Sequence, residues 1–399
     1  MKLHFHLILK IVETLDLIFS EGRYADKVLE KTFKQNRQLG SRDRKFFAET
    51  VYEIVRHFRL YSEIMKSEEN FDLVVVHLIK TNGELPDWDE FSGFDVEKIK
   101  NRLKYKFEDQ VQYSFPDWLH ELGQKEFTDQ WPALMKALNQ PAKVYLRTNT
   151  LKITREKLKE EFSKEDIETE FVADFPDCLV LPERKNVFVT QCFKKGYFEV
   201  QDASSQMIAP LLKIEPGLRV VDACAGAGGK TLHMASLMKN KGKIIAMDIH
   251  EWKLTELKKR TARDGVDIVE TKVIENSKTI KRLENTFDRV LLDVPCSGLG
   301  VLRRNPDTKW KLSMDEINRL IELQKTILAD YSKMCKPSGL MVYATCSILT
   351  SENEDQVKWF LTTETGKNWK LINEVRMWPH KDGHDGFYGA LMQNSNATS

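Results

Sequence analysis

Two cysteines stand in polar loops, each shortly after an apolar run. Cys296 lies in the loop Val294–Gly298, and Cys346 comes two residues after the run Leu340–Ala344. A thiolate in such a loop can meet a substrate and attack it, because the thiolate is the nucleophilic form of cysteine. Asp293 places a carboxylate just before the first loop, where it can accept hydrogen bonds from a bound group. The two loops are therefore candidates for covalent catalysis.

The other cysteines are interpreted as inert side chains. None of the six belongs to a CxxC pair, and no histidine lies near Cys296 or Cys346 in the sequence. This spacing favours neither a disulfide framework nor a tetrahedral zinc site, and it suits a reducing cytoplasm. Cys178, Cys192 and Cys335 are expected to act as small apolar residues, the last at the end of an amphipathic helix. A redox disulfide between Cys296 and Cys346 remains an alternative.

A glycine-rich turn offers a place for a nucleotide-like cofactor. It runs from Asp222 to Thr231 (DACAGAGGKT), between an apolar run and a helical pattern, and its glycines let the backbone approach a ligand closely. A phosphate-binding P-loop would need a glycine where Cys224 stands. Asp248 ends the next apolar run, about 20 residues further on, where a carboxylate can accept hydrogen bonds from a ribose. A dinucleotide fold remains possible at this point.

These segments belong to an alternation of short strands and longer helices that begins after Leu218 and is typical of a parallel sheet flanked by helices. Strands are predicted at Arg219–Asp222, Lys243–Asp248, Ile268–Val273, Asp288–Asp293 and Leu340–Ala344, and helices at Lys230–Met238, Trp252–Arg263 and Ser313–Cys335. In open parallel sheets, ligands bind beyond the carboxyl ends of the strands. We therefore expect the glycine turn, Asp248, Asp293, Cys296 and Cys346 to share one rim of the sheet.

Two other patterns precede the sheet. The first hundred or so residues are predicted to be helical, because Ile8, Ile11, Leu15 and Ile18 recur at helical spacing and a second stripe, Phe47–Phe58, follows a start signal at Ser41. Between roughly Pro141 and Val200, short β-rich runs indicate a small α+β module. The runs are Val144–Leu146, Cys178–Leu181, Val187–Val189 and Tyr197–Val200.

Two thiols at one site suit methyl transfer to carbon 5 of a pyrimidine. That carbon is a poor nucleophile, but addition of a thiolate to carbon 6 makes it enamine-like and able to attack an electrophilic methyl group. A second thiol can help remove the carbon 5 proton and expel the first, and Asp293 can hold the base by its nitrogen 3 edge. Oxygen and nitrogen acceptors, by contrast, need only a base.

At these residues the chain resembles the RNA (cytosine-C5) methyltransferases of the Nop2/Sun and RsmB kind. The family motifs DxCAAPGGKT, DAPCSG and TCS correspond to Asp222–Thr231, Asp293–Gly298 and Thr345–Ser347. Further similar segments lie between about Ser114 and Leu391. They are Leu146–Asn149, Gln201–Ser205, Gly300–Asp307, Glu352–Glu354 and Asp385–Tyr388.

The resemblance implies a role for each of these residues. Cys346 would be the nucleophile and Cys296 the residue that assists release, with Asp293 as a third catalytic residue. S-adenosyl-L-methionine is the implied cofactor, and RNA is the implied partner, with ribosomal RNA preferred and transfer RNA next. The implied cofactor-binding residues are Cys224, Ala225, Gly226, Ala227, Gly228, Gly229, Lys230, Asp248, Asn276 and Asp293.

The implied fold is α/β. A Rossmann-like class I methyltransferase domain with a mainly parallel sheet is expected at 206–393, after a small RNA-recognition-like α+β module at 131–205 and an all-helical NusB-like domain at 1–130. Residues 394–399 are predicted to form a disordered tail. The apolar start of the chain is interrupted by Lys10, Glu13 and Asp16, so we expect no signal peptide and no membrane span. From the cysteine spacing we expect a cytoplasmic protein, and we expect it to be monomeric.

The chain departs from the family motifs at two places. Gly226-Ala227 stands where the family has Ala-Pro, which loosens the turn but keeps its backbone donors. Glu275-Asn276 stands where the family usually has an aspartate after the third strand. The side-chain carbonyl of Asn276 could accept the hydrogen bond from the adenine amino group instead.

Composition leaves two other function classes open. The net charge of +1 gives no argument for a nucleic-acid partner, although six basic residues cluster at Lys31, Lys34, Arg37, Arg42, Arg44 and Lys45. A nicotinamide-dependent oxidoreductase could use the same turn and Asp248, but it would leave both rim cysteines without a role. A non-catalytic RNA-binding assembly factor would need neither cysteine. The two thiols therefore favour the methyltransferase.

Overall fold

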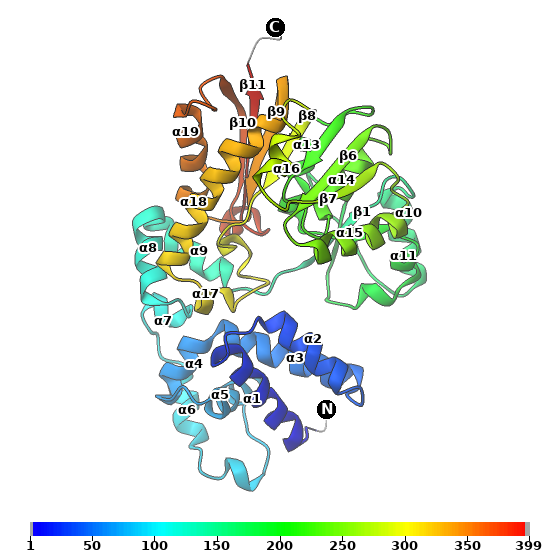
Figure 1. The fold of residues 1–399 in the computed structure, drawn as a ribbon. Helices are drawn as coiled ribbons and strands as arrows, with labels where there is room; N and C mark the ends of the chain where they lie inside the picture. Colours follow the sequence, from blue (N-terminus) through cyan, green and yellow to red (C-terminus); the bar gives the residue numbers. More distant parts are fainter. Residues whose placement is uncertain (1–2, 396–399) are drawn as a thin grey trace. The chain divides into compact units, whose positions relative to one another are not determined.

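The computed structural model describes residues 3–395 and divides into two compact units. The helical unit comprises Met1–Gln140 together with Leu302–Met314, and the catalytic unit comprises Pro141–Val301 and Asp315–Ser399 (Figure 1). Within the described residues, no helix combines the length and the low polarity that crossing a bilayer requires.

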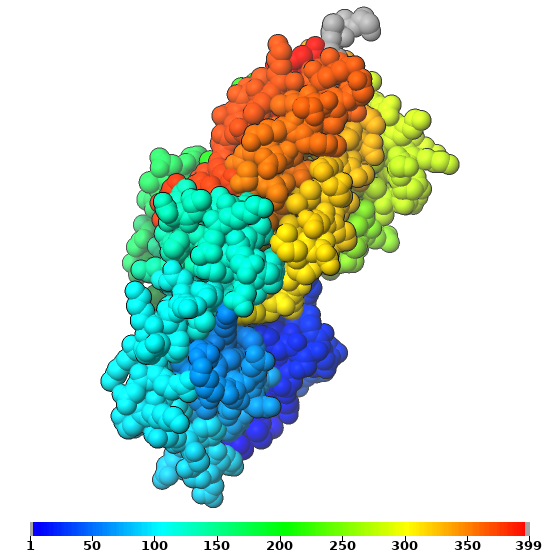
Figure 2. Space-filling model, turned by 90° about the vertical axis from the view of Figure 1, so that its left-hand side faces the viewer, coloured from blue at the N-terminus to red at the C-terminus, as the bar shows by residue number. Residues whose placement is uncertain are grey.

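The helical unit forms around amphipathic helices, as predicted. On α1 (Phe5–Phe19) the stripe Ile8, Ile11, Leu15 and Ile18 is buried, and the middle of α5 (Asn70–Asn82) is buried almost all round. These residues share one core with α2 (Ala25–Gln35), α3 (Ser41–Arg56), α4 (Phe58–Met65) and α6 (Val96–Leu103). The remaining helices are α7 (Asp109–Gln112), α8 (Asp117–Phe127), α9 (Trp131–Leu138) and the 3-10 turns η1 (Asp89–Phe91) and η2 (Thr128–Gln130). The helical unit supplies the blue-to-cyan surface in Figure 2.

A short segment from the second half of the chain completes the helical unit. It carries α17 (Thr308–Lys311), and its Lys309 is only 1% exposed. The Lys309 ammonium donates to the Arg56 carbonyl and to Asn139 Oδ1, each at 3.0 Å, and lies 4.7 Å from the centre of the Phe115 ring. Burial lowers the pKa of Lys309. The buried ammonium thus ties the inserted segment to the helices.

Replacing Lys309 by methionine should destabilise the helical unit. The Arg56 carbonyl and the Asn139 amide oxygen would lose their donor inside the protein, which should lower the free energy of unfolding by about 2–3 kcal/mol. Hydrogen exchange of the α3 amides, compared with the exposed control Lys98→Met, measures the effect. Equal exchange in both variants would contradict the anchoring role.

The catalytic unit begins with the small α+β module. Its sheet has the order β2-β3-β1-β4, with β1 (Val144–Thr148), β2 (Glu170–Phe171), β3 (Cys178–Leu181) and β4 (Phe198–Val200) all paired antiparallel. It is accompanied by α10 (Arg155–Lys164) and α11 (Gln191–Lys194). The strand predicted at Val187–Val189 is wrong: these residues form the 3-10 turn η3, because the Asn186 side chain caps the Phe188 amide and Phe188 and Val189 face solvent.

The large sheet has the order β10-β11-β9-β8-β5-β6-β7 (Figure 1). The strands β5 (Arg219–Asp222), β6 (Lys243–Asp248), β7 (Val269–Val273), β8 (Phe287–Asp293) and β9 (Cys335–Thr345) are parallel, as predicted. Two antiparallel strands that the sequence did not reveal, β10 (Trp369–Met377) and β11 (Phe387–Asn394), extend one edge. The predicted Rossmann-like, mainly parallel fold is confirmed.

Helices cover both faces of this sheet because its strand residues alternate between two cores. Val220, Ile244 and Leu291 pack with helices α13 (Ile208–Leu211), α14 (Gly229–Leu237) and α15 (Glu251–Asp264). Their neighbours Val221 and Ile245 pack on the other face. There the covering helices are α16 (Ser277–Lys281), α18 (Met314–Tyr331) and α19 (Glu354–Thr362). A short helix, α12 (Ala203–Gln206), precedes α13.

Two predicted boundaries change near the end of the chain. Cys335 does not end a helix, because α18 stops at Tyr331 and, after the 3-10 turn η5 (Ser332–Met334), Cys335 is the buried first residue of β9. Of the predicted tail, Asn394 ends β11 and is buried, and the Ser395 amide donates to the Asn368 carbonyl. Residues 396–399 lie outside the described part of the chain.

Candidate active site

Four loops meet beyond the carboxyl ends of the parallel strands. The glycine loop follows β5, Asp248 ends β6, the loop with Cys296 follows β8, and Cys346 comes directly after β9. The structure brings the predicted residues into contact in three places. The Sγ atoms of Cys296 and Cys346 lie 3.4 Å apart, Lys230 Nζ lies 2.6 Å from Asp293 Oδ2, and the Gly226 amide lies 3.0 Å from Asp248 Oδ2.

The two thiols share one hydrogen bond. This bond to Cys346 and burial together raise the pKa of Cys296 well above its ordinary value, and the Glu352 carboxylate adds to the effect. Cys296 therefore keeps its proton at neutral pH and can donate it to the sulfur of Cys346. Two cysteine side chains in hydrogen-bond contact allow one sulfur to attack a substrate while the other transfers a proton.

The buried carboxylate of Glu352 joins the two cysteine loops. Glu352 is 0% exposed and belongs to the 3-10 turn η6 (Thr350–Glu352). Its carboxylate accepts from the Ser297 amide at 2.8 Å, the Ser297 hydroxyl at 2.5 Å and the Ser347 hydroxyl. Gln324 of α18 donates a further hydrogen bond at 2.9 Å. Since each serine is the neighbour of a cysteine, one carboxylate sets the spacing of both thiols.

The Glu352→Gln substitution should slow turnover about 10- to 100-fold. An amide offers one acceptor where the carboxylate offers two, and its NH2 group would face the donors of Ser297 and Ser347, so the thiols would lose their alignment. The rate at which diamide oxidises Cys296 and Cys346 to a disulfide reports their spacing without turnover.

Asp355→Asn, at an exposed neighbouring position, is the matched control for Glu352→Gln. Wild-type rates of turnover and of disulfide formation in Glu352→Gln would show that Glu352 does not align the thiols.

Asp293 is held by the glycine-loop helix. Lys230 pairs with Asp293 Oδ2, and the Asp293 side chain remains 28% exposed. The same ammonium lies 4.7 Å from the centre of the Phe387 ring, which fixes its position. The ion pair orients the carboxylate at the rim, next to the loop that carries Cys296.

The glycine loop has the shape that a closely approaching ligand needs. Gly228 caps α14 with φ of 89°, and a Cβ there would lie 2.0 Å from Leu257 Cδ1, so only glycine fits. Gly226, with φ of 54°, and Gly229 both face open space, since added Cβ atoms would meet nothing within 4 Å. Asp248 accepts from the amides of Gly226 and His250 at 3.0 and 2.8 Å. The open side, the first turn of α14 and Asp248 fit an adenosyl cofactor.

The start of the loop is buried. Burial raises the pKa of Asp222 to about 7, and Asp222 Oδ2 accepts from the Thr231 hydroxyl at 2.7 Å. Burial also raises the pKa of the Cys224 thiol, which packs against the core together with its neighbour Ala223. Ala225 is 8% exposed. Cys224 and Ala225 therefore shape the loop with uncharged side chains.

Asn276 lies at the predicted place after β7, but its side chain has a local partner. Its Oδ1 caps α16 by accepting from the Lys278 amide at 3.0 Å. The side-chain oxygen that was expected to accept a hydrogen bond from the adenine amino group thus caps the N-terminus of α16.

Several residues of the site were missed by sequence reasoning. Glu352 belonged to a similar segment, but nothing in its type or spacing predicted that it reaches both cysteine loops. Gln324 carried no signal, and neither did Arg260 of α15, which donates to the Ala227 carbonyl of the glycine loop. Each is one polar residue on an amphipathic helix. Their contacts depend on how distant elements pack.

Family models match two parts of the chain. A model described as 16S rRNA methyltransferase RsmB/F matches residues 209–393, which contain every predicted site residue. A model described as the RsmF/B-like ferredoxin-like domain matches residues 115–188.

Individual proteins are also similar. The probable ribosomal RNA small subunit methyltransferase B of Synechocystis sp. is 35% identical over 304 residues, covering 71% of this chain and 68% of that protein. Ribosomal RNA small subunit methyltransferase B of Pectobacterium carotovorum subsp. carotovorum is 36% identical, covering 71% and 67%. Among solved structures, the crystal structure of PH0851 has a TM-score of 0.82 at 26% identity and covers 98% of this chain and 99% of that one.

Proposed function

Because the chain belongs to the RsmB/F family of 16S rRNA methyltransferases, which use S-adenosyl-L-methionine, we propose that it methylates carbon 5 of a cytosine in small-subunit ribosomal RNA. The observation that carries this proposal is the pair of thiols 3.4 Å apart at the rim that also holds the glycine loop. A methyltransferase acting on oxygen or nitrogen needs no nucleophilic cysteine. We propose that it works in the cytoplasm as a monomer.

The reaction begins with Cys346. Its thiolate adds to carbon 6 of the cytosine, which forms the Sγ–C6 bond and moves the C5=C6 electron pair toward carbon 5. Asp293, oriented by Lys230, holds the nitrogen 3 edge of the base during this addition. The glycine loop and Asp248 would hold S-adenosyl-L-methionine, which would supply the electrophilic methyl group for carbon 5.

Cys296 completes the reaction. Once Cys346 is bonded to carbon 6, its sulfur no longer carries a titrating proton, which removes the largest cause that raises the pKa of Cys296, and Cys296 then passes its proton to water. Its thiolate then removes the carbon 5 proton, the C5=C6 bond forms again, and the Sγ–C6 bond breaks to return the Cys346 thiolate. Thus Cys346 forms and breaks the bond to carbon 6, and Cys296 removes the carbon 5 proton.

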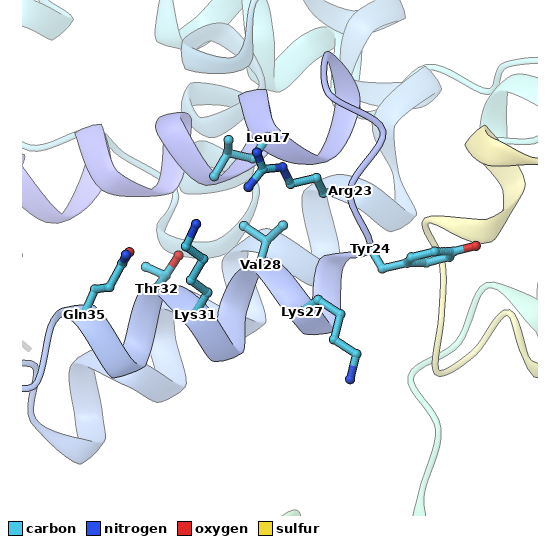
Figure 3. Close-up of a pocket in the computed structure, with 8 residues that line it drawn as sticks. All are labelled: Leu17, Arg23, Tyr24, Lys27, Val28, Lys31, Thr32 and Gln35. Atoms are coloured by element: carbon cyan, nitrogen blue, oxygen red, sulfur yellow. The ribbon is translucent and has the colours of Figure 1, made fainter. Parts of the chain in front are cut away.

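The helical unit has a groove with three basic lining residues, of which Arg23 pairs with Glu21 at 2.6 Å and Lys27 with Asp26 at 3.5 Å, and we propose that RNA phosphates bind here. The groove lies between α1 and α2, has a volume of about 530 Å³ and is lined by Leu17, Arg23, Tyr24, Lys27, Val28, Lys31, Thr32 and Gln35. Figure 3 shows Arg23 and Lys31 extending into the space between the helices. Lys31 belongs to the predicted basic cluster. Charges of this kind bind RNA backbones regardless of sequence, which supports a large RNA substrate.

The test is methylation of unmodified ribosomal RNA by the wild-type protein with radiolabelled S-adenosyl-L-methionine, followed by bisulfite mapping. Label on one cytosine of small-subunit RNA is the expected result. Label only on transfer RNA would show that transfer RNA is the substrate and would leave the proposed methylation of carbon 5 unchanged. No label on either RNA would leave the non-catalytic assembly factor as the better hypothesis.

A further inference from the structure

Two arginines from outside the glycine loop hold its carbonyl groups. Arg147 of β1 donates from Nη1 to the Gly229 carbonyl at 2.6 Å. Arg260 of α15 donates from Nη1 to the Ala227 carbonyl at 2.6 Å. Arg147 is 2% exposed and the Arg260 side chain 19%. The two arginines therefore bind carbonyl groups of the glycine loop from outside the loop.

Both guanidinium groups are themselves fixed by β4 and the residue that follows it. Glu199 of β4 pairs with Arg260 through two hydrogen bonds, of 2.6 and 3.3 Å. Gln201 accepts from Arg147. Although burial alone would raise the pKa of Glu199, the neighbouring Arg260 lowers it, so Glu199 stays charged. These contacts of Arg147 and Arg260, which we call the clamp, thus connect Glu199 and Gln201 of the small α+β module to the glycine loop.

This contact controls where the loop amides point. Because a peptide unit is planar and trans, a fixed carbonyl also fixes the N–H at the opposite side of the unit. Arg260 thereby holds the peptide unit whose Gly228 amide donates to the Ala225 carbonyl at 2.9 Å and closes the loop, and Arg147 orients the Lys230 amide in the first turn of α14. The loop needs such help, since glycine at 226 and alanine at 227 leave its backbone freer than Ala-Pro would.

We propose that Arg147 and Arg260 are positioning residues that hold the glycine loop in its cofactor-binding shape, so that the small module sets the affinity for S-adenosyl-L-methionine. The inference deepens the proposed function and rests on it only for the identity of the cofactor. It also gives a role to two similar segments, Leu146–Asn149 and Gln201–Ser205, that the chemistry of the thiols did not use.

The test compares Arg260→Gln with a matched control, Arg263→Gln. Arg263 lies one turn further along α15, pairs with the same Glu199 and stacks over Phe193 at 4.2 Å. Among the described residues, the Arg263 side chain contacts Glu199, Asp264 and Phe193 and donates to no carbonyl of the glycine loop. Each variant removes one ion pair to Glu199, but only Arg260→Gln removes the grip on the loop. Arg147→Gln is a second loop variant, used if it folds.

Calorimetric titration of the full-length protein with S-adenosyl-L-methionine should give a Kd about tenfold higher for Arg260→Gln than for wild type, the effect of one charge-assisted hydrogen bond. Arg263→Gln should stay within about twofold while losing a similar amount in Tm. In RNA methylation, Arg260→Gln should raise the KM for the cofactor and leave kcat at saturation unchanged.

An unchanged Kd in Arg260→Gln, or an equal rise in both variants, would overturn the clamp. A wild-type protein that binds the cofactor but methylates no RNA would overturn the proposed function and leave the clamp in place. The two failures are therefore distinguishable, because the Kd is measured without RNA.

Discussion

Replacing Cys346 by alanine is expected to lower kcat by at least about 10⁴-fold. Without the thiol, no Sγ–C6 bond forms and carbon 5 of the cytosine remains a poor nucleophile, however well the cofactor is held. The Sγ of Cys296 lies only 3.4 Å away, but it belongs to the loop after the neighbouring strand and does not occupy the position from which Cys346 would attack carbon 6, so it should not replace Cys346. Incorporation of labelled methyl into RNA measures the loss.

The control for this substitution is Cys192→Ala, which removes a buried thiol from the small module. Its kcat should stay within about threefold of wild type, since Cys192 packs in a core far along the chain from both rim loops. Cofactor titration of Cys346→Ala should give a wild-type Kd. Turnover that survives in Cys346→Ala would refute the attack by Cys346. If that remaining turnover were lost when Cys296 was also replaced, Cys296 would be the attacking residue.

Replacing Cys296 by alanine is expected to trap the protein on its RNA. Cys346 can still attack carbon 6 and the methyl group can still be transferred, but the residue that removes the carbon 5 proton is missing. Turnover should fall about 10²- to 10⁴-fold, the usual contribution of a positioned acid or base. A labelled RNA that migrates with the protein on a denaturing gel, and is released by nuclease digestion, measures the adduct.

The double variant Cys296→Ala/Cys346→Ala separates this adduct from tight binding, because it lacks the attacking sulfur and should give no denaturant-resistant band. Its RNA affinity before denaturation should match that of Cys296→Ala. If Cys296→Ala turned over normally and trapped nothing, the carbon 5 proton would have to leave through another base at the rim.

Much of the catalytic unit could be predicted because its signals are local. The runs that became β5, β6 and β8 are short and apolar, and the glycines between Asp222 and Thr231 mark where one strand ends and a helix begins. Parallel strands place their carboxyl ends at one edge, so the meeting of Cys296, Cys346, Asp248 and Asp293 followed from topology alone. The chemical roles of those residues are predictions that the experiments above test.

The errors fall where local pattern and tertiary packing compete. Val187–Val189 has the composition of a strand, yet the Asn186 cap and an exposed surface favour a 3-10 turn. Cys335 follows an amphipathic helix in sequence, but pairing of β9 with β8 draws it into the sheet. β10 lies at the sheet edge and carries exposed polar residues, so its sequence lacks the apolar run that marks a buried strand.

The parallel sheet, the glycine turn and the two thiols at strand ends were predictable, since each depends on residues that are neighbours in the chain. How these parts are held depends on contacts between residues that are far apart in the chain. Glu352 reaches Ser297 across 55 positions, and Arg260 reaches Glu199 across 61. A hydrogen bond acts over about 3 Å, so whether such a pair forms depends on the packing of whole elements and not on the spacing of residues along the chain.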